Sequence, residues 1–143
     1  MIGMIVTGHG QFASGLTSSV KLLAGMPEKF CAVDYLQEDT ADDLEEKLED
    51  AVESLKECSG ILILADLAGG TPFRTAADLM VENNGIPMRL IAGVNLGMLI
   101  QANMARGYVE SLDDLSEMAV DEGRKQITLL EKEVIEEGRR ERG

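Results

Sequence analysis

The sequence predicts an α/β fold: a doubly wound, mainly parallel sheet of four strands in the order 2-1-3-4, with helices on both faces. Four apolar runs rich in β-branched residues alternate with segments of helical spacing, and this alternation is typical of parallel sheets with right-handed crossovers. The runs are apolar throughout, as expected for strands buried on both faces. At 143 residues, we expect a single domain over residues 1–143, whose charged tail from about residue 131 is a candidate mobile segment.

Two strand–helix units are expected in the first half of the chain. Residues 1–6 form an apolar run that the loop at residues 7–10 ends. A helix is expected after it, because apolar residues recur at helical spacing: Phe12, Leu16, Val20 and Leu23. This helix is expected to end near Gly25. Residues 30–35 predict a second strand. Asp39 or Thr40 can then cap a second helix, which Gly60 is expected to stop.

The pattern continues in the middle of the chain. Residues 61–65 predict a third strand. In the helix that follows, Thr71 is the expected N-cap and Pro72 suits the first helical position, where its missing N–H is not needed. This helix continues to about Glu82. A turn at residues 83–85 then leads to a strand at 88–92 and a helix at 95–105.

The C-terminal part is less regular. Ser111 can cap a last helix that begins near Leu112 and loses its apolar periodicity around Gly123. Residues 127–130 have strand-like content inside a tail whose composition favours a helix. Both readings of this segment stay open.

Charge and composition exclude several kinds of partner. The formal net charge of -13 and the pI near 4.4 repel polyanions, so we expect no nucleic-acid partner. The apolar runs are too short to span a membrane and the N-terminus lacks the features of a signal peptide, which predicts a cytoplasmic protein. Cys31 and Cys58 lack the spacing of metal ligands, so we expect reduced thiols.

The strand order places the two most distinctive loops side by side. Strands 1 and 3 are neighbours in a 2-1-3-4 sheet, and the reversal of winding between them opens a crevice at their carboxyl ends. His9, the only histidine, follows the first strand and Asp66 follows the third. Asp66 can hydrogen-bond one ring nitrogen and leave the other as a nucleophile. The simpler alternatives are a helix-capping or strand-end histidine and an acidic loop residue.

The glycines and threonines of these loops favour an oxyanion at the same place. A diglycine lets a ligand approach the backbone, and the helix after it directs unpaired N–H groups and a positive dipole end at the crevice. Thr71 either caps this helix or faces a phosphoryl group, and Thr7 is either a strand-end residue or a hydrogen-bond partner of His9 or its phosphate. The candidate phosphate-binding residues are Thr7, Gly8, Gly10, Gly69, Gly70 and Thr71.

Other chemistries of the same architecture lack their residues. The first loop has no acidic pair of the receiver type, and the chain has neither a GxSxG nucleophile elbow nor a P-loop. One histidine without clustered carboxylates does not suit a metal centre, and the scarce aromatics do not suit a flavin. We therefore expect no metal and no cofactor.

Three motifs together resemble a known family over about residues 1–125. They are Thr7-Gly8-His9-Gly10, then Asp-x-x-Gly-Gly-Thr-Pro at residues 66–72, then Ala-Gly-Val-Asn-Leu-Gly-Met-Leu at residues 92–99. This combination is similar to the IIA component of the mannose family of the bacterial sugar phosphotransferase system.

The resemblance implies a phosphocarrier, a phosphotransferase component in which His9 is the phosphoryl acceptor, Asp66 its supporting carboxylate and Thr71 the neighbouring hydroxyl. The donor would be the phosphocarrier HPr and the acceptor a IIB component, which phosphorylates a sugar as a membrane IIC/IID complex imports it. Members form homodimers that exchange a short strand near the C-terminal end, which would place that strand at residues 126–130.

The sequence departs from the family at Leu67 and Ala68, where some members carry a bulky aromatic residue. Two alternatives remain at this stage. One is a phosphotransfer subunit that serves a dihydroxyacetone kinase, and the other is a regulatory binding module controlled by phosphorylation. The choice of sugar belongs to the IIB, IIC and IID partners in this family, so these residues predict none.

Overall fold

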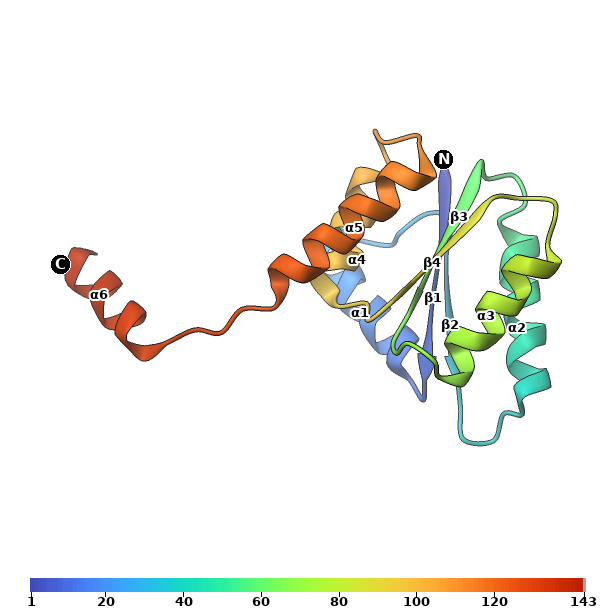
Figure 1. The fold of residues 1–143 in the computed structure, drawn as a ribbon, viewed down its shortest axis with the longest axis horizontal. Helices are drawn as coiled ribbons and strands as arrows, with labels where there is room; N and C mark the ends of the chain where they lie inside the picture. The colour runs from blue at the N-terminus through green and yellow to red at the C-terminus, as the bar shows by residue number, and fades with distance from the viewer. Residues whose placement is uncertain (143) are drawn as a thin grey trace.

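The computed structural model describes residues 1–142 and contains a four-stranded parallel sheet in the order β2-β1-β3-β4 (Figure 1). The predicted fold class and strand order are confirmed. The strands are β1 (Ile2–His9), β2 (Phe30–Tyr35), β3 (Gly60–Ala65) and β4 (Met88–Ala92). The helices are α1 (Phe12–Ala24), α2 (Ala41–Ser54), α3 (Thr71–Glu82), α4 (Leu96–Ala105), α5 (Leu112–Gln126) and α6 (Lys132–Arg142).

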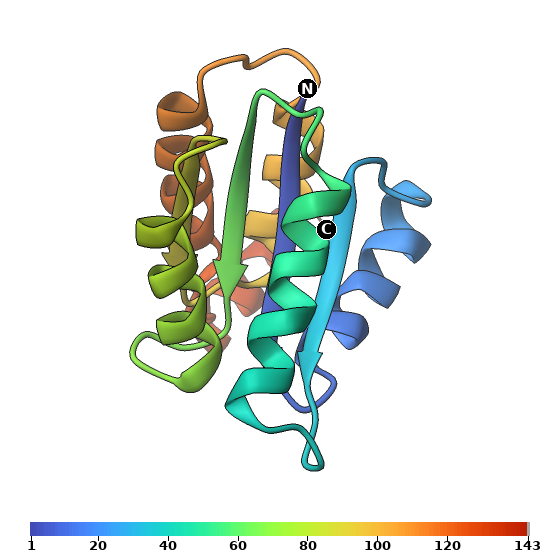
Figure 2. The same ribbon diagram turned by 90° about the vertical axis from the view of Figure 1, so that its right-hand side faces the viewer.

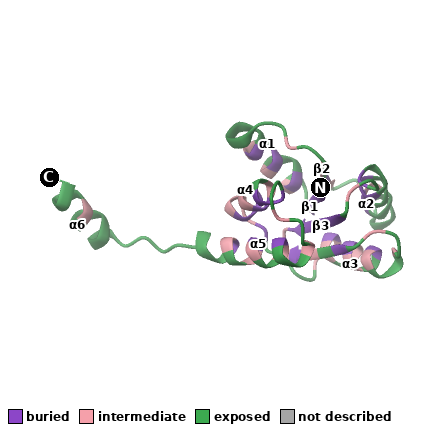
Figure 3. Cartoon of the chain, turned by 90° about the horizontal axis from the view of Figure 1, so that it is seen from above, coloured by how far each residue is buried: buried purple, intermediate pink, exposed green. Residues whose placement is uncertain are grey.

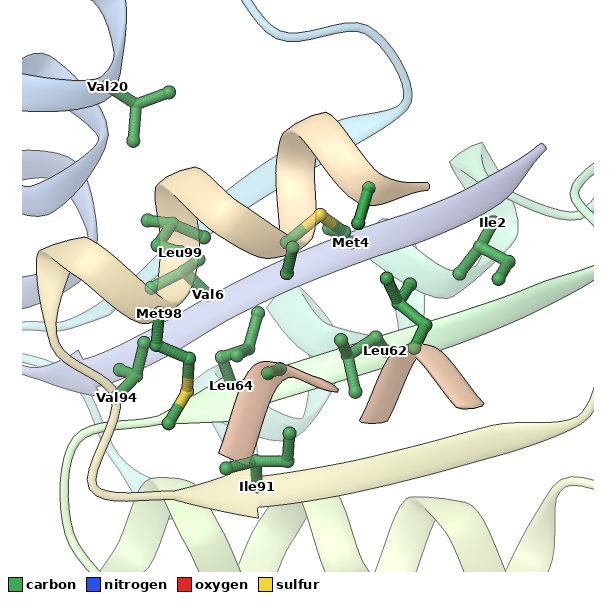
Figure 4. Packing of buried hydrophobic residues seen from close by; sticks show 14 of the residues in the cluster. Ile2, Met4, Val6, Val20, Leu62, Leu64, Ile91, Val94, Met98 and Leu99 are labelled. Carbon is green, nitrogen blue, oxygen red and sulfur yellow. The ribbon is translucent and has the colours of Figure 1, made fainter. Parts of the chain in front are cut away.

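Helices cover both faces of the sheet. Helices α2 and α3 pack on one face, and α1, α4 and α5 pack on the other (Figures 1 and 2). On the latter face, Met4 and Leu62 belong to one hydrophobic cluster with Leu99 of α4 (Figure 4). On the opposite face, Ile5 and Ile63 belong to a second cluster with α2 and α3. Strands β1 and β3 are therefore buried on both faces, as their continuous apolar runs predict.

Three boundaries differ from the sequence-based expectation. Strand β1 does not end at residue 6 but continues to His9, because residues 7–9 pair with the end of β2. Gly60 opens β3, whereas α2 already ends at Ser54. Helix α3 starts at Thr71 with Gly70 as its N-cap, so Thr71 is not the cap. The backbone of the diglycine, rather than a hydroxyl, begins this helix.

The helix caps at other positions follow the sequence. Thr40 and Asp43 form a capping box at the start of α2. The side chain of Asn95 caps α4 and that of Ser111 caps α5. Helix α5 continues past Gly123, where a Cβ atom would lie 2.4 Å from Cε of Met98. A glycine there lets α5 approach α4 closely, which explains why the apolar periodicity stops while the helix continues.

The C-terminal segment extends away from the rest of the chain. Residues 127–131 form neither a helix nor a strand, and they lead to α6, which stands apart from the sheet and is exposed along most of its length (Figures 1 and 3). Leu129 in this segment is 87% exposed. The exchanged strand expected at residues 126–130 is not formed within this single chain and stays a prediction. No helix within residues 1–142 is both long and apolar enough to cross a membrane.

Candidate functional site

His9 and Asp66 meet at the carboxyl edge of the sheet. The Nδ1 atom of His9 lies 2.8 Å from Oδ2 of Asp66, and the backbone N–H of His9 donates to the same oxygen at 2.9 Å. The other carboxylate oxygen accepts the N–H of Leu67 at 2.8 Å. Parallel pairing of β1 with β3 ends at Thr7 and Ala65, so these two candidate side chains follow neighbouring strand ends. The expected juxtaposition is present.

The environment keeps the Asp66 carboxyl ionised. Partial burial raises the pKa of this carboxyl. Hydrogen bonds from the backbone and ring of His9 and from the backbone of Leu67 lower the pKa by more than burial raises it, so that it lies below the ordinary value. An ionised carboxylate is only an acceptor. In neutral His9 the proton therefore belongs on Nδ1, and Nε2 carries the free lone pair.

The free edge of the imidazole faces the start of α3. A Cβ atom on Gly70 would lie 2.8 Å from Cε1 and 3.4 Å from Nε2 of His9, so only glycine leaves room for the ring. The first hydrogen bond of α3 runs from Arg74 N–H to Gly70 C=O at 2.9 Å. The amides before Arg74 lack a partner within the helix. They and the positive end of the helix dipole favour an oxyanion beside Nε2.

Gly8 lies beside Asp66 and Phe12, not beside the free edge of the imidazole where a phosphate contact was expected. A Cβ atom there would lie 2.6 Å from Cδ1 of Phe12 and 2.9 Å from Cγ of Asp66. Gly8 therefore makes room for the carboxylate rather than for a ligand at Nε2. Gly10 and Gly69, with φ values of +59° and +81°, occupy the left-handed region that favours glycine and shape the two loops.

The two threonines differ in access. Thr7 is fully buried in β1, and its hydroxyl has no hydrogen-bond partner among residues 1–142. Because the hydroxyl is fully buried, the structure does not support a contact between Thr7 and phosphate. Thr71 is half-buried at the first position of α3, where its carbonyl accepts the Thr75 hydroxyl at 2.7 Å. Its place at the start of the helix leaves the role of a phosphate contact open to it.

One neighbour of His9 was not anticipated. Tyr35, at the end of β2, lies opposite His9 in the β1–β2 register. The two ring centroids are 6.1 Å apart with an interplanar angle of 62°. The sequence predicts the strand but not how it is aligned with β1, so nothing in the sequence indicates this contact. Within residues 1–142 there is also no group of three or more His, Cys, Asp or Glu residues suited to a metal ion.

Comparison with known proteins identifies the family. A family model described as the fructose IIA component of the phosphotransferase system matches residues 3–120. The chain belongs to this IIA family. The mannose-specific EIIAB component of Escherichia coli strain K12 is 32% identical over 135 residues, which cover 94% of this IIA chain and 41% of the E. coli protein. The chain thus spans less than half the length of that relative.

Further relatives have similar lengths. The fructose-specific EIIA component of Bacillus subtilis strain 168 is 31% identical over 118 residues, which cover 82% of this IIA chain and 80% of the relative. The crystal structure of an EIIA component from Streptococcus agalactiae superposes with a TM-score of 0.84 at 32% identity, covering 90% of this chain and 97% of that one.

Replacing Gly8 tests the packing around Asp66. We expect Gly8→Ala to lower the free energy of unfolding by about 1–3 kcal/mol, because the new methyl group overlaps Phe12 and the carboxylate. Gly15→Ala is the matched control, since a Cβ on this α1 glycine meets nothing within 4 Å and should stabilise the helix by about 0.5–1 kcal/mol. Urea unfolding measures both variants. Equal stability of Gly8→Ala and the wild type would contradict the proposed packing.

The depressed pKa of Asp66 predicts a pH-dependent contribution to stability. At pH values between the folded and unfolded pKa of Asp66, the unfolded chain binds more protons, so this contribution rises with pH. It is fully present above the unfolded pKa of about 3.9 and is lost as the pH falls through the folded value. The difference in unfolding free energy between wild type and Asp66→Asn should therefore be larger above the unfolded pKa of Asp66 than in acid, where it shrinks. A difference independent of pH down to acid unfolding would show that the charge of Asp66 does not matter.

Proposed function

We propose that this chain is a phosphocarrier of a bacterial sugar phosphotransferase system, in which Nε2 of His9 accepts a phosphoryl group from phospho-HPr and passes it to a IIB component. The observation that carries the proposal is the 2.8 Å contact of Asp66 with Nδ1. It leaves Nε2 as the only ring nitrogen with a free lone pair. The ring is also accessible, since the His9 side chain is 45% exposed.

The transfer balances with the groups of the site. The lone pair of Nε2 forms the new N–P bond while the bond between phosphorus and the donor breaks, and the bonding electrons return to the donor. The ring becomes a phosphorylated cation that keeps its Nδ1 proton, and Asp66 offsets this charge. The same steps in reverse deliver the phosphoryl group to the acceptor.

The loops supply the phosphate contacts. We assign the phosphoryl oxygens to the amides at the start of α3, with Gly69 and Gly70 giving access and the hydroxyl of Thr71 as a further donor. Gly10 shapes the loop after His9. Gly8 acts through Asp66, and Thr7 stays in the strand without a phosphate contact.

The partners follow from the family. The relatives are named for mannose, fructose and sorbose systems. The relationship therefore supports a relay of a sugar system without indicating which sugar is transported. It does not favour a kinase subunit or a regulatory module. The net charge of -13 suits steering towards a basic donor protein. We place this relay in the cytoplasm, with the IIC/IID complex as an indirect partner beyond IIB.

A homodimer is the second part of the proposal. The outer edge of β4 and α5 border a groove of about 440 Å³, which is lined by Leu90, Ile91 and Val120 together with polar and charged residues of both elements. Residues 127–130 are extended and carry exposed apolar side chains, among them Leu129. We propose that this segment of one copy adds to the β4 edge of a second copy, which would bury those side chains and pair the open edge.

The relay is tested by intact mass after incubation with phosphoenolpyruvate, enzyme I and HPr. We expect the wild type to gain one acid-labile phosphoryl group and His9→Ala to gain none, because His9 is the only histidine in the chain. Phosphorylated HPr in both samples is the control for the donor. Labelling of His9→Ala, or an unlabelled wild type beside charged HPr, would refute the proposal.

The dimer is tested by sedimentation of matched leucine variants. Leu129→Asp should shift the protein from dimer to monomer, because it places a charge in the proposed interface. Leu22→Asp in α1 is the control, since Leu22 is 86% exposed and Leu129 is 87% exposed. A monomeric wild type, or identical sedimentation of both variants, would exclude this exchange.

A further inference from the structure

Tyr35 contacts the site through both its backbone and its ring. Its carbonyl oxygen accepts the N–H of Gly10 at 2.7 Å, so it holds the residue directly after the histidine. Its ring meets the imidazole in an edge-to-face arrangement with the centroids 6.1 Å apart. Aromatic pairs at this separation and angle are attractive.

The position of the Tyr35 ring is itself fixed. Tyr35 is the last residue of β2, and its half-buried side chain packs against the hydrophobic cluster beneath α2 and α3. Loop residues on the other side of His9, Leu67 and Ala68, are exposed. The tyrosine is therefore the part of the surroundings of the imidazole that the core holds in place.

The imidazole needs more than one support. Asp66 holds only the Nδ1 corner through this hydrogen bond, and the His9 side chain is 45% exposed, so part of the ring has no protein neighbour. Gly70 borders the Cε1–Nε2 edge with its backbone and has no side chain to cover the faces of the ring. A rigid surface on another side is required to keep Nε2 directed at the start of α3.

We infer that Tyr35 is a positioning residue for phosphoryl acceptance, and that its ring, not its hydroxyl, holds the His9 imidazole with Nε2 towards α3. The inference rests on the proposed function, since it names a further residue of the same site. It acts through His9 and requires no contact of Tyr35 with the phosphoryl group.

The test uses phosphoramidate, a small donor that requires no protein docking. Nε2 forms the new N–P bond while the P–N bond of the donor breaks and ammonia leaves. Tyr35→Leu removes the ring, Tyr35→Phe keeps it, and Tyr108→Leu is the control at a tyrosine that is 70% exposed after α4. Each variant retains the backbone bond to Gly10.

We expect Tyr35→Leu to accept phosphate about five-fold more slowly, with little change in the apparent KM, in line with the strength of an aromatic pair. Tyr35→Phe and Tyr108→Leu should stay within about two-fold of the wild type. The NMR signal of the His9 Cε1 proton should shift in Tyr35→Leu and return close to its wild-type position in Tyr35→Phe. Because the Tyr35 ring also packs against the core, the rates are compared per folded molecule, with the folded fraction of each variant measured by urea unfolding.

Three results would overturn the inference: wild-type rates in Tyr35→Leu, an equal loss in Tyr35→Phe, or no phosphorylation of the wild type by phosphoramidate. Its failure is distinct from failure of the relay. Labelling by phosphoramidate but not by phospho-HPr would refute the proposed donor and still leave the Tyr35 comparison decisive.

Discussion

The parallel pairing of β1 with β3 is the constraint on which the site depends. These strands are hydrogen-bonded from Ile2 and Gly60 through Thr7 and Ala65, and the N–H of Asp66 continues the ladder to the Thr7 carbonyl at 3.2 Å. A shift of one strand by one residue along the other would turn its side chains to the opposite face of the sheet. Because both faces carry tightly packed clusters, the core that stabilises the sheet also sets the distance between histidine and carboxylate.

Absent side chains matter as much as present ones at this edge. A Cβ on Gly8 would overlap the Asp66 carboxylate, and a Cβ on Gly70 would overlap the imidazole. Two glycines thus create two adjacent positions, one for the ionised carboxylate and one for the proposed nucleophile. Each glycine gives up side-chain packing and backbone order that another residue would contribute.

The sequence predicted the elements whose signals are local or periodic. Strands buried on both faces left continuous apolar runs, and the 2-1-3-4 order brought His9 and Asp66 to one edge. The predicted end of β1 was wrong because pairing with β2 continues the strand past Gly8. The prediction of Thr71 as the cap of α3 was wrong because Gly70 has the extended backbone of the N-cap. Local propensity cannot show either effect.

Long-range contacts were beyond the sequence for a different reason. Tyr35 meets His9 only through the register of β2. Arg106 is a buried cation whose guanidinium donates to the carbonyls of Ile2, Glu28 and Lys29. Burial lowers the pKa of this guanidinium, which is tolerated because backbone carbonyls surround it. Neither residue belongs to a sequence motif, because the distant partners named here are backbone carbonyls or a ring, and only Asn103, which accepts from the Arg106 guanidinium, is near in the chain.

A relay needs a phosphorylated state that is neither too unstable to form nor too stable to discharge. In the proposed relay, the Asp66 carboxylate stabilises the positive charge of the phosphorylated ring, and the start of α3 stabilises the phosphoryl oxygens. The His9 side chain is 45% exposed while that of Asp66 is 10% exposed. Water beside the ring weakens both electrostatic interactions, whereas the more buried carboxylate keeps its geometry. The division between a fixed, shielded partner and an open nucleophile therefore suits reversible transfer better than a fully buried pair would.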